Sequence, residues 1–336
     1  MNAAPPWKPG DPLVSVVTVT YQHAAFIEEC VKSVLAQRTD FPFELLIGED
    51  QSTDGTREIC QRLADAHPER IRLFLRDRKD VIHILGRPTG RANVIGLYHE
   101  ARGKYIAVCP GDDHWTDPGK LQRQVDLMEA RQELSACFTN AWEERAGERN
   151  DYLRGWLKGQ VPTGDLGPGD VLLRNYVPSQ TFLFRRDLLL PLPKEFWTAP
   201  ISDHLLVLHL ASQGPIGYLD GHTAVRRAHP GGLISMKGAL HKIEVNVATM
   251  EALRTMLGAP HAERLMTHRR QLLEEGLQLA LDTGEREHAR RFWDRLRTDP
   301  GSSIGLRRRL RMKVLLDHPG LAKAIHRLRT GTFGGR

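Results

Sequence analysis

The chain has 336 residues, of which 40% are hydrophobic and 26% are charged. At roughly 100–200 residues per domain this length accommodates two compact domains, and the composition is that of an ordinary folded protein, which excludes a disordered chain. No apolar stretch approaches the roughly 18 residues that a membrane-spanning helix needs, so the sequence excludes an integral membrane protein.

The N-terminal segment and the cysteines bear on the compartment. Residues 1–12 contain two consecutive prolines and no apolar core of the kind that a secretory signal peptide carries, so we expect a cytoplasmic protein. The four cysteines, Cys30, Cys60, Cys109 and Cys137, form no Cys-x-x-Cys pair and lie in hydrophobic surroundings. We therefore expect buried reduced thiols rather than a disulfide or a zinc site.

The net charge of +6 is concentrated at the C-terminal end. Residues 301–336 contain nine Lys or Arg and one acid, a net charge of +8, whereas the other 300 residues total −2. This distribution argues against a nucleic-acid partner. The basic residues lie beside leucines in an amphipathic pattern, which fits either peripheral contact with an anionic membrane or a solvated or partner-docking helix face.

The first half of the chain alternates strand and helix patterns. Short β-branched or apolar runs predict strands, and apolar residues repeating at helical spacing predict helices. In chain order these are a strand at 13–20, a helix at 26–37, a strand at 43–48, a helix from 56, a strand at 71–75, a helix at 92–100, a strand at 105–109 and a helix from 120. Such alternation predicts an α/β, Rossmann-like fold with a mostly parallel sheet and helices on both faces.

The second half is less regular and then becomes helical. Strand-like segments at 136–144, 179–186 and 216–221 accompany a helix at 203–213, and helices at 268–282 and 286–297 form a predicted hairpin. We expect a catalytic domain over 1–240, with a donor half at about 13–130 and an acceptor half at about 131–240. A helical, basic region would cover 241–336.

Acidic loops follow the predicted strands, and a ligand site of an open parallel sheet lies where such loops emerge. In PGDDHWTDP, Asp112 and Asp113 come directly after a buried strand, and two such carboxylates need a positive partner. Mg²⁺ or Mn²⁺ is one such partner, whereas a helix cap plus a solvated turn acid is the structural alternative. In GEDQSTDGT, capping explains Ser52 to Asp54 but does not explain Glu49 and Asp50.

Three segments together resemble the inverting family 2 glycosyltransferases, which have the nucleotide-diphospho-sugar (GT-A) fold. They are LVSVVTVTYQHAAFIEECVKSVLAQ, FELLIGEDQSTDGTREI and GKYIAVCPGDDHWTDPGKLQRQVDLM, in the order and spacing of the family. The resemblance extends over about residues 13–232. Three positions depart from the family pattern, since Glu49 replaces Asp, Gln51 replaces Gly, and Pro110 replaces an acid of the metal site.

The resemblance implies a nucleotide and metal site in the donor half. The residues implied to bind the donor nucleotide are Thr20, Tyr21, Glu49, Asp50, Arg91, Asn93 and Asp112. Of these, Thr20 and Tyr21 would border the base pocket and Asp50 would contact the base. Asp113 is implied to be the direct ligand of the metal, with Asp112 at the ribose.

The resemblance also implies a catalytic base and a further metal contact. Asp203, in APISDHLLVL, matches the aspartate that removes the proton of the acceptor hydroxyl, and its structural alternative is a helix N-cap. His229, in VRRAHPGG, would lie near the metal or phosphates, or else be an ordinary loop histidine. Gly231 and Gly232 would allow that loop to move.

The sequence thus predicts a non-processive inverting glycosyltransferase with Mn²⁺ or Mg²⁺ as cofactor. Its donor would be a nucleoside-diphosphate sugar, most simply a UDP or dTDP sugar, and its acceptor a glycan or a lipid-linked or other small molecule of polysaccharide or glycoconjugate assembly. The alternatives are a sugar-phosphate nucleotidyltransferase and a catalytically inactive binding scaffold. The first would carry a Gly-rich basic loop after its first strand, which TVTYQHAAF is not.

Overall fold

A computed structural model describes residues 7–229, 238–299, 305, 312 and 314–316. The chain divides into two compact units, residues 1–232 and 233–336. Every basic residue of the predicted tail segment 301–336 lies outside the described residues, as do Gly231 and Gly232. Among the helices that the structure describes, none is long and apolar enough to cross a membrane.

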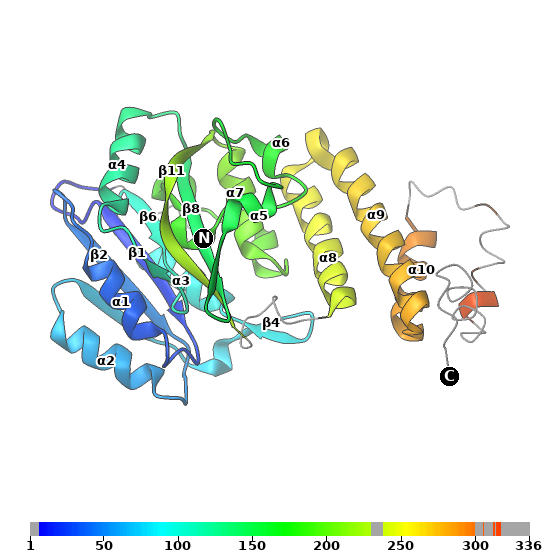
Figure 1. Ribbon diagram of the computed structural model, residues 1–336, viewed down its shortest axis with the longest axis horizontal. Coiled ribbons are helices and arrows are strands. Elements are labelled where there is room, and N and C mark those ends of the chain that lie inside the picture. The colour runs from blue at the N-terminus through cyan, green and yellow to red at the C-terminus, as the bar shows by residue number, and fades with distance from the viewer. Residues whose placement is uncertain (1–6, 230–237, 300–304, 306–311, 313, 317–336) are drawn as a thin grey trace. The chain divides into compact units, whose positions relative to one another are not determined.

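The first unit is built on a curled sheet whose first half is parallel (Figure 1). Strands β1 (Val14–Thr20), β2 (Phe43–Glu49), β3 (Ile71–Leu75) and β6 (Tyr105–Val108) lie in the order β3-β2-β1-β6. The helices that follow them are α1 (Ile27–Leu35), α2 (Thr56–Ala66), α3 (Arg91–Glu100) and α4 (Lys120–Ala130). The predicted α/β order of this half is confirmed, because apolar strands of a parallel sheet must be covered on both faces.

The register of the parallel strands determines where the loops meet. Thr20 pairs with Glu49, and Glu49 pairs with Leu75, so three strands end in one row. Strand β6 ends earlier, opposite Val17, and the chain continues beside β1 until the backbone N–H of Gly111 donates to the carbonyl of Val19. The segment after Gly111 therefore emerges beside the ends of β1 and β2.

The second half of the sheet is mixed. Its order continues from β6 through β10 (Leu183–Arg185), β8 (Ala136–Arg145), β11 (Ile216–Ala228) and β7 (His114–Trp115), with β9 (Glu148–Asp151) on β8. Strand β10 is antiparallel to both neighbours. The predicted strand at 179–186 is half wrong, since Ser179–Thr181 forms a 3₁₀ turn, and the strand predicted at 216–221 continues to Ala228.

Short elements complete the first unit. They are the hairpin strands β4 (Ile82–Ile84) and β5 (Arg87–Thr89), helices α5 (Tyr152–Trp156), α6 (Pro168–Val171) and α7 (Ser202–Ala211), and the 3₁₀ turns Arg78–Asp80, Arg186–Leu188 and Lys194–Trp197. All four cysteines are free and buried, which confirms the predicted reduced thiols.

The second unit contains helices α8 (Ala239–Leu257), α9 (Ala259–Thr283) and α10 (Arg286–Arg297). The predicted hairpin of the last two is confirmed, and Gly276 explains how closely they pack, since an added Cβ there would lie 2.6 Å from the ring of Phe292. The side chain of Arg269 pairs with Glu251 and with the buried Asp299, which ties α9 to α8 and to the end of α10.

Candidate active site

The loops after β1 and β2 are joined by hydrogen bonds. The backbone N–H of Gln22 donates to the Ser52 hydroxyl at 2.9 Å, and that of His23 donates to the Thr56 hydroxyl at 2.8 Å. Gln51 has a φ of 58°, a left-handed conformation that glycine adopts without strain. A glycine at this position, as the resembling family has, would adopt this conformation without strain. The two hydrogen bonds join the loops after β1 and β2.

Glu49 and Asp50 have different surroundings. The Glu49 carboxylate is buried, accepts from the backbone N–H groups of Ser52 (2.6 Å) and Gln51 (3.2 Å), and pairs with Arg57. These contacts stabilise the loop and satisfy both oxygens of the Glu49 carboxylate. Asp50 instead lines a pocket of about 180 Å³.

The pocket is lined by charged side chains, and some of their atoms have no hydrogen-bond partner among the described residues. Burial raises the pKa of Asp50, and Arg78, whose Nη1 is 3.8 Å away, opposes this shift. The Arg76 side chain also lines the pocket, and its Nε and Nη2 atoms are buried without a hydrogen-bond partner among the described residues. The Arg78 guanidinium lies 3.9 Å from the ring centre of the half-exposed Tyr21. Sequence reasoning missed Arg76, although its position directly after β3 was the available signal.

Arg91 and Asn93 contact protein groups. The buried Arg91 guanidinium donates to the carbonyl oxygens of Phe196 and, at 2.9 Å, of Ala199, so it anchors the segment that leads into α7. Asn93 lines the pocket and donates to the carbonyl of Gly48 at 2.9 Å. Of these two residues, the structure therefore brings only Asn93 to the predicted nucleotide pocket.

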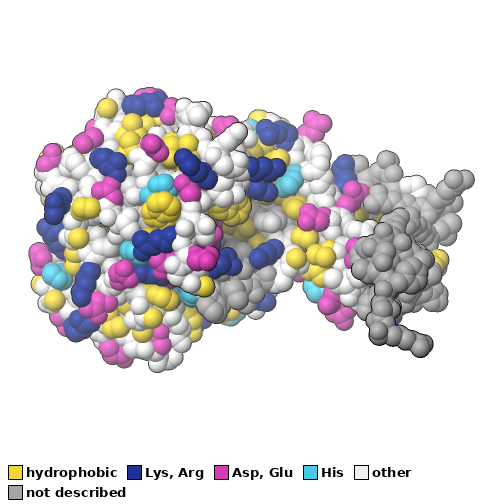
Figure 2. Space-filling model, in the orientation of Figure 1, with side chains coloured by type: hydrophobic (Ala, Val, Ile, Leu, Met, Phe, Trp, Pro, Cys, Tyr) yellow, Lys and Arg dark blue, Asp and Glu magenta, His cyan; other side chains and the backbone are white. Residues whose placement is uncertain are grey.

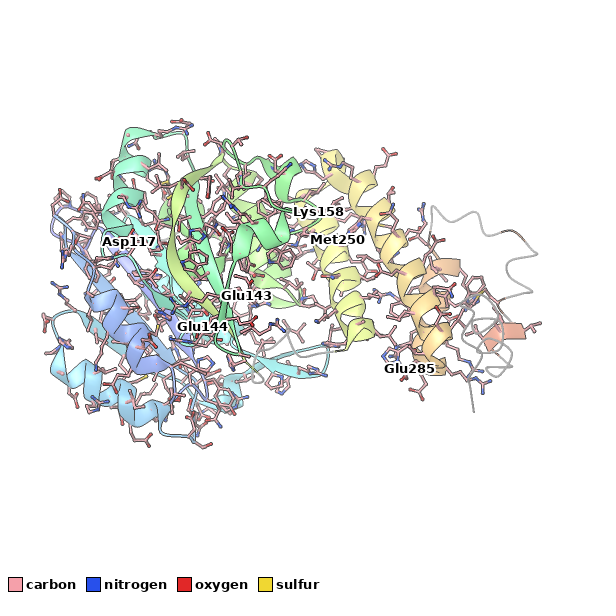
Figure 3. All side chains as sticks on the ribbon, viewed as in Figure 1. Asp117, Glu143, Glu144, Lys158, Met250 and Glu285 are labelled. Carbon is pink, nitrogen blue, oxygen red and sulfur yellow. The ribbon has the colours of Figure 1, made fainter. Side chains whose placement is uncertain are left out.

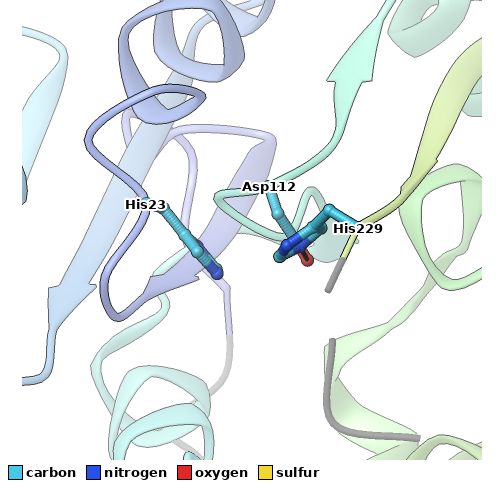
Figure 4. A group of neighbouring side chains, drawn as sticks. All are labelled: His23, Asp112 and His229. Atoms are coloured by element: carbon cyan, nitrogen blue, oxygen red, sulfur yellow. Dashed lines mark hydrogen bonds and ion pairs between the residues drawn. The ribbon is translucent and has the colours of Figure 1, made fainter. Parts of the chain in front are cut away.

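Asp112, His23 and His229 converge from three segments of the chain (Figure 4). One donor atom of each lies within 4.8 Å of the others, and His229 Nε2 is 3.2 Å from Asp112 Oδ2. Burial disfavours the charged form of Asp112, but the hydrogen bond from His229 and the charge of His23 lower its pKa overall. The same hydrogen bond raises the pKa of His229, whereas burial lowers that of His23.

Asp113 lies apart from this cluster. Its buried Oδ1 accepts a 2.9 Å hydrogen bond from the backbone N–H of Arg227 on β11. Burial, and next the charge of Asp112, raise the pKa of Asp113 well above its usual range. The structure therefore brings Asp112 rather than Asp113 next to the predicted His229. Sequence reasoning did not single out His23.

Asp203 is exposed in the first turn of α7. The helix begins at Ser202, and its N-cap residue is Ile201, which makes no side-chain cap. Asp203 is therefore not the N-cap residue, but its carboxylate accepts a 2.8 Å hydrogen bond from the backbone N–H of His204 in the first turn. Burial is the main cause of the shifted pKa values of Arg91, Tyr98 and the buried Tyr152 of α5, and the charge of Asp203 raises the pKa of all three. The charge of Asp113 also raises the pKa of Tyr152.

The acceptor half contains several aromatic and charged side chains. The Arg226 guanidinium lies 5.8 Å from the ring centre of Tyr152 and binds Glu143 of β8, which Figure 3 labels beside Glu144. Three aromatic side chains of this half differ in exposure: Tyr176 is buried, the Trp142 ring stacks on that of His222 with 3.9 Å between ring centres, and Trp156 is 39% exposed. Charged side chains of both signs are mixed over the face shown in Figure 2.

The family model of glycosyl transferase family 2 matches residues 15–189, more than half of the chain. The chain belongs to glycosyl transferase family 2. An uncharacterized protein of Mycobacterium tuberculosis is 32% identical over 224 residues, which are 66% of this chain and 60% of that protein. The chain thus spans about 60% of the length of this relative.

Two solved structures share the fold of this family 2 chain. S. aureus TarS 1–349, in complex with UDP-GlcNAc, has a TM-score of 0.61 at 16% identity over 96% of this chain and 93% of that chain. The mannosyltransferase PcManGT of Pyrobaculum calidifontis, in complex with GDP-Man and Mn²⁺, has a TM-score of 0.55 at 18% identity, over 97% and 89%. These likenesses confirm the predicted GT-A fold.

Proposed function

We propose that this family 2 chain is a non-processive inverting glycosyltransferase that uses a nucleoside-diphosphate sugar. The observation that carries the proposal is the surroundings of two acids that follow strands of the parallel half. Asp50, after β2, lines a pocket, and Asp112, after β6, lies beside His23 and His229. Asp203, on α7, and Asp113 both act electrostatically on Tyr152, so these two acids share a neighbour.

The pocket suits a base that has an N–H group beside a carbonyl oxygen. The carboxylate of Asp50 accepts hydrogen bonds, and the unpartnered N–H groups of Arg76 donate them. A base with an N–H beside a carbonyl oxygen satisfies both, and the N3–H and O4 of uracil or thymine form such a pair. The edge of guanine also offers one, and the neighbours TarS and PcManGT were solved with UDP-GlcNAc and GDP-Man. We propose a UDP or dTDP donor, and a GDP sugar is the competitor that the donor test must include.

Asp112 and His229 would hold a divalent cation, Mn²⁺ or Mg²⁺. The Asp112 carboxylate oxygen and the His229 imidazole nitrogen, 3.2 Å apart, are donor types that fit such a cation and would hold it. When bound, the cation supplies positive charge that stabilises the departing nucleoside diphosphate. Asp113 would support the loop through its hydrogen bond with Arg227.

Asp203 would act as the general base. Its exposed carboxylate would accept the proton of the acceptor hydroxyl as that oxygen bonds to the anomeric carbon and the bond to the diphosphate breaks. Attack opposite the leaving group inverts the anomeric centre. Tyr152 and the exposed Trp156 would receive the acceptor, for which we propose a glycan or a lipid-linked sugar.

A donor panel tests this function. Purified protein is incubated with UDP-, dTDP- and GDP-sugars, with and without Mn²⁺, and release of the nucleoside diphosphate is measured. We expect one donor class to be used and its free diphosphate to raise the melting temperature in a metal-dependent way. Proton NMR of the product should show an inverted anomeric centre. Binding without any release would support the inactive scaffold instead.

A further inference from the structure

His23 occupies a defined position at the cluster of Asp112 and His229. Its ring is 6.0 Å from that of His229, centre to centre, and all three side chains point into the same space in Figure 4. The residue lies in the loop after β1, whereas Asp112 follows β6 and His229 follows β11. Three separate segments therefore contribute one donor each.

The fold holds the His23 imidazole in place from two sides. The backbone N–H of His23 donates to Thr56, and its carbonyl accepts from the N–H of Phe26 at 2.9 Å. The ring Nδ1 lies 3.3 Å from the Thr20 hydroxyl. Within the described part of the chain, Nε2 of His23 makes no hydrogen bond. A histidine whose one nitrogen is fixed by an outer partner and whose other nitrogen is free is arranged as metal-binding histidines are.

We propose that His23 is a third ligand of the cation site, and that the resulting two-histidine, one-carboxylate set selects Mn²⁺ and similar transition ions over Mg²⁺. The inference rests on the proposed function, because it concerns the same cation. Mg²⁺ prefers oxygen ligands and keeps its waters, whereas imidazole nitrogen suits first-row transition ions. Pro110 stands where the resembling family has an acid of the metal site, so that position provides no carboxylate. Of the three donors at the cluster, two are histidine nitrogens and one is a carboxylate oxygen.

A binding experiment with the full chain tests the proposal without requiring turnover. Free Mn²⁺ is measured by electron paramagnetic resonance during titration, alone and with UDP, and Mg²⁺ is then added as competitor. The variant is His23→Asn. The matched control is His99→Asn, at an exposed histidine of the last turn of α3. Circular dichroism melting verifies that both variants fold.

We expect the wild type and His99→Asn to bind Mn²⁺ alike and to prefer it to Mg²⁺. His23→Asn should weaken Mn²⁺ binding by at least about tenfold, since even outer-shell changes cost that much, and should change Mg²⁺ binding far less. An equal loss for both ions, an unchanged Mn²⁺ affinity, or no Mn²⁺ binding by the wild type with and without UDP would each overturn the proposal.

A spectroscopic readout separates ligation from a merely structural role. In electron spin echo envelope modulation, imidazole nitrogens bound to Mn²⁺ modulate the echo, so at saturating Mn²⁺ the nitrogen modulation should be weaker in His23→Asn than in the wild type. Equal modulation would remove His23 from the ligand set. If Mn²⁺ binds as expected but no donor sugar is turned over, the proposed transfer reaction fails while the assignment of His23 stands.

Discussion

His229 Nε2 lies 3.2 Å from Asp112 Oδ2, although 117 residues separate the two in the chain. The contact exists because β11 runs beyond the apolar segment that indicated a strand and pairs with β8 as far as Ala228. The next residue, His229, therefore lies beside the loop after β6, where it contacts Asp112. Asp113, one residue further, is turned toward the backbone of β11 instead.

This arrangement predicts opposite outcomes for two neighbouring substitutions. Asp112→Asn removes the charged oxygen beside His229 and should abolish measurable Mn²⁺ binding, with transfer lowered by at least about 100-fold. Asp113→Asn keeps an oxygen that accepts from Arg227, so its Mn²⁺ affinity should stay within about threefold of the wild type. Mn²⁺ titration and donor turnover check both. Loss of the metal in Asp113→Asn alone would restore Asp113 as the direct ligand.

Asp203→Asn tests the catalytic base. Turnover should fall by roughly 10²–10⁴-fold with little change in nucleotide affinity, since general-base contributions are of that size. The melting temperature should be unchanged, because the asparagine oxygen can accept the same hydrogen bond from the backbone N–H of His204. Asp220→Asn is the control, as the Asp220 carboxylate accepts from the Tyr218 hydroxyl on β11. Near-normal turnover in Asp203→Asn would exclude it as the base.

The alternating elements of the first half were predictable because they depend on local patterns. A β-branched run such as 14–20, followed by apolar residues at helical spacing from Ile27, is typical of a strand and helix in a parallel sheet that is covered on both faces. The antiparallel strand β10 was not predictable as a pairing, because it is three residues long and joins β6 to β8. Its partners lie far away in sequence.

The site was predictable in its residue types more than in its contacts. Asp50 lines a pocket, and its signal in the sequence was an acid directly after a strand that helix capping does not explain. Glu49 obeys the same pattern, yet backbone N–H groups occupy its carboxylate. His23 was not predicted as a site residue, because a single histidine in a loop does not indicate a metal site by itself. Only the fold places it beside Asp112 and His229, which follow β6 and β11.

Arg91→Lys distinguishes a positioning role from a phosphate contact. The guanidinium holds two carbonyl groups of the segment before α7, and burial lowers its pKa to about 10. A lysine lacks the planar fork that reaches both carbonyl groups at once, so the free energy of unfolding should fall by about 1–3 kcal/mol and kcat should fall. The Kd for UDP should stay within about twofold. Arg102→Lys, at an exposed position, is the control. Weaker UDP binding with normal kcat would instead favour the phosphate contact.

Lys120 provides a pH-dependent test of the core beneath the site. Its ammonium group is fully buried, donates to Gln124 Oε1 at 2.6 Å and lies 4.2 Å from the ring centre of Trp115. Burial lowers the pKa of Lys120 from its ordinary value of 10.5 to about 8. Between these two values the unfolded chain binds more protons than the folded chain, so this group makes the free energy of unfolding rise with pH.

Lys120→Met should therefore flatten the pH profile of stability. Below pH 8 the folded wild type carries a buried charge whose desolvation costs stability, and this cost is relieved as the pH rises from about 8 toward 10.5. The variant has no such charge, so its free energy of unfolding in urea should rise less than that of the wild type between pH 7.5 and about 9.5. Lys32→Met, on the exposed face of α1, should retain the wild-type rise. Parallel profiles for the wild type and Lys120→Met would show that Lys120 loses no proton in the folded state over this range.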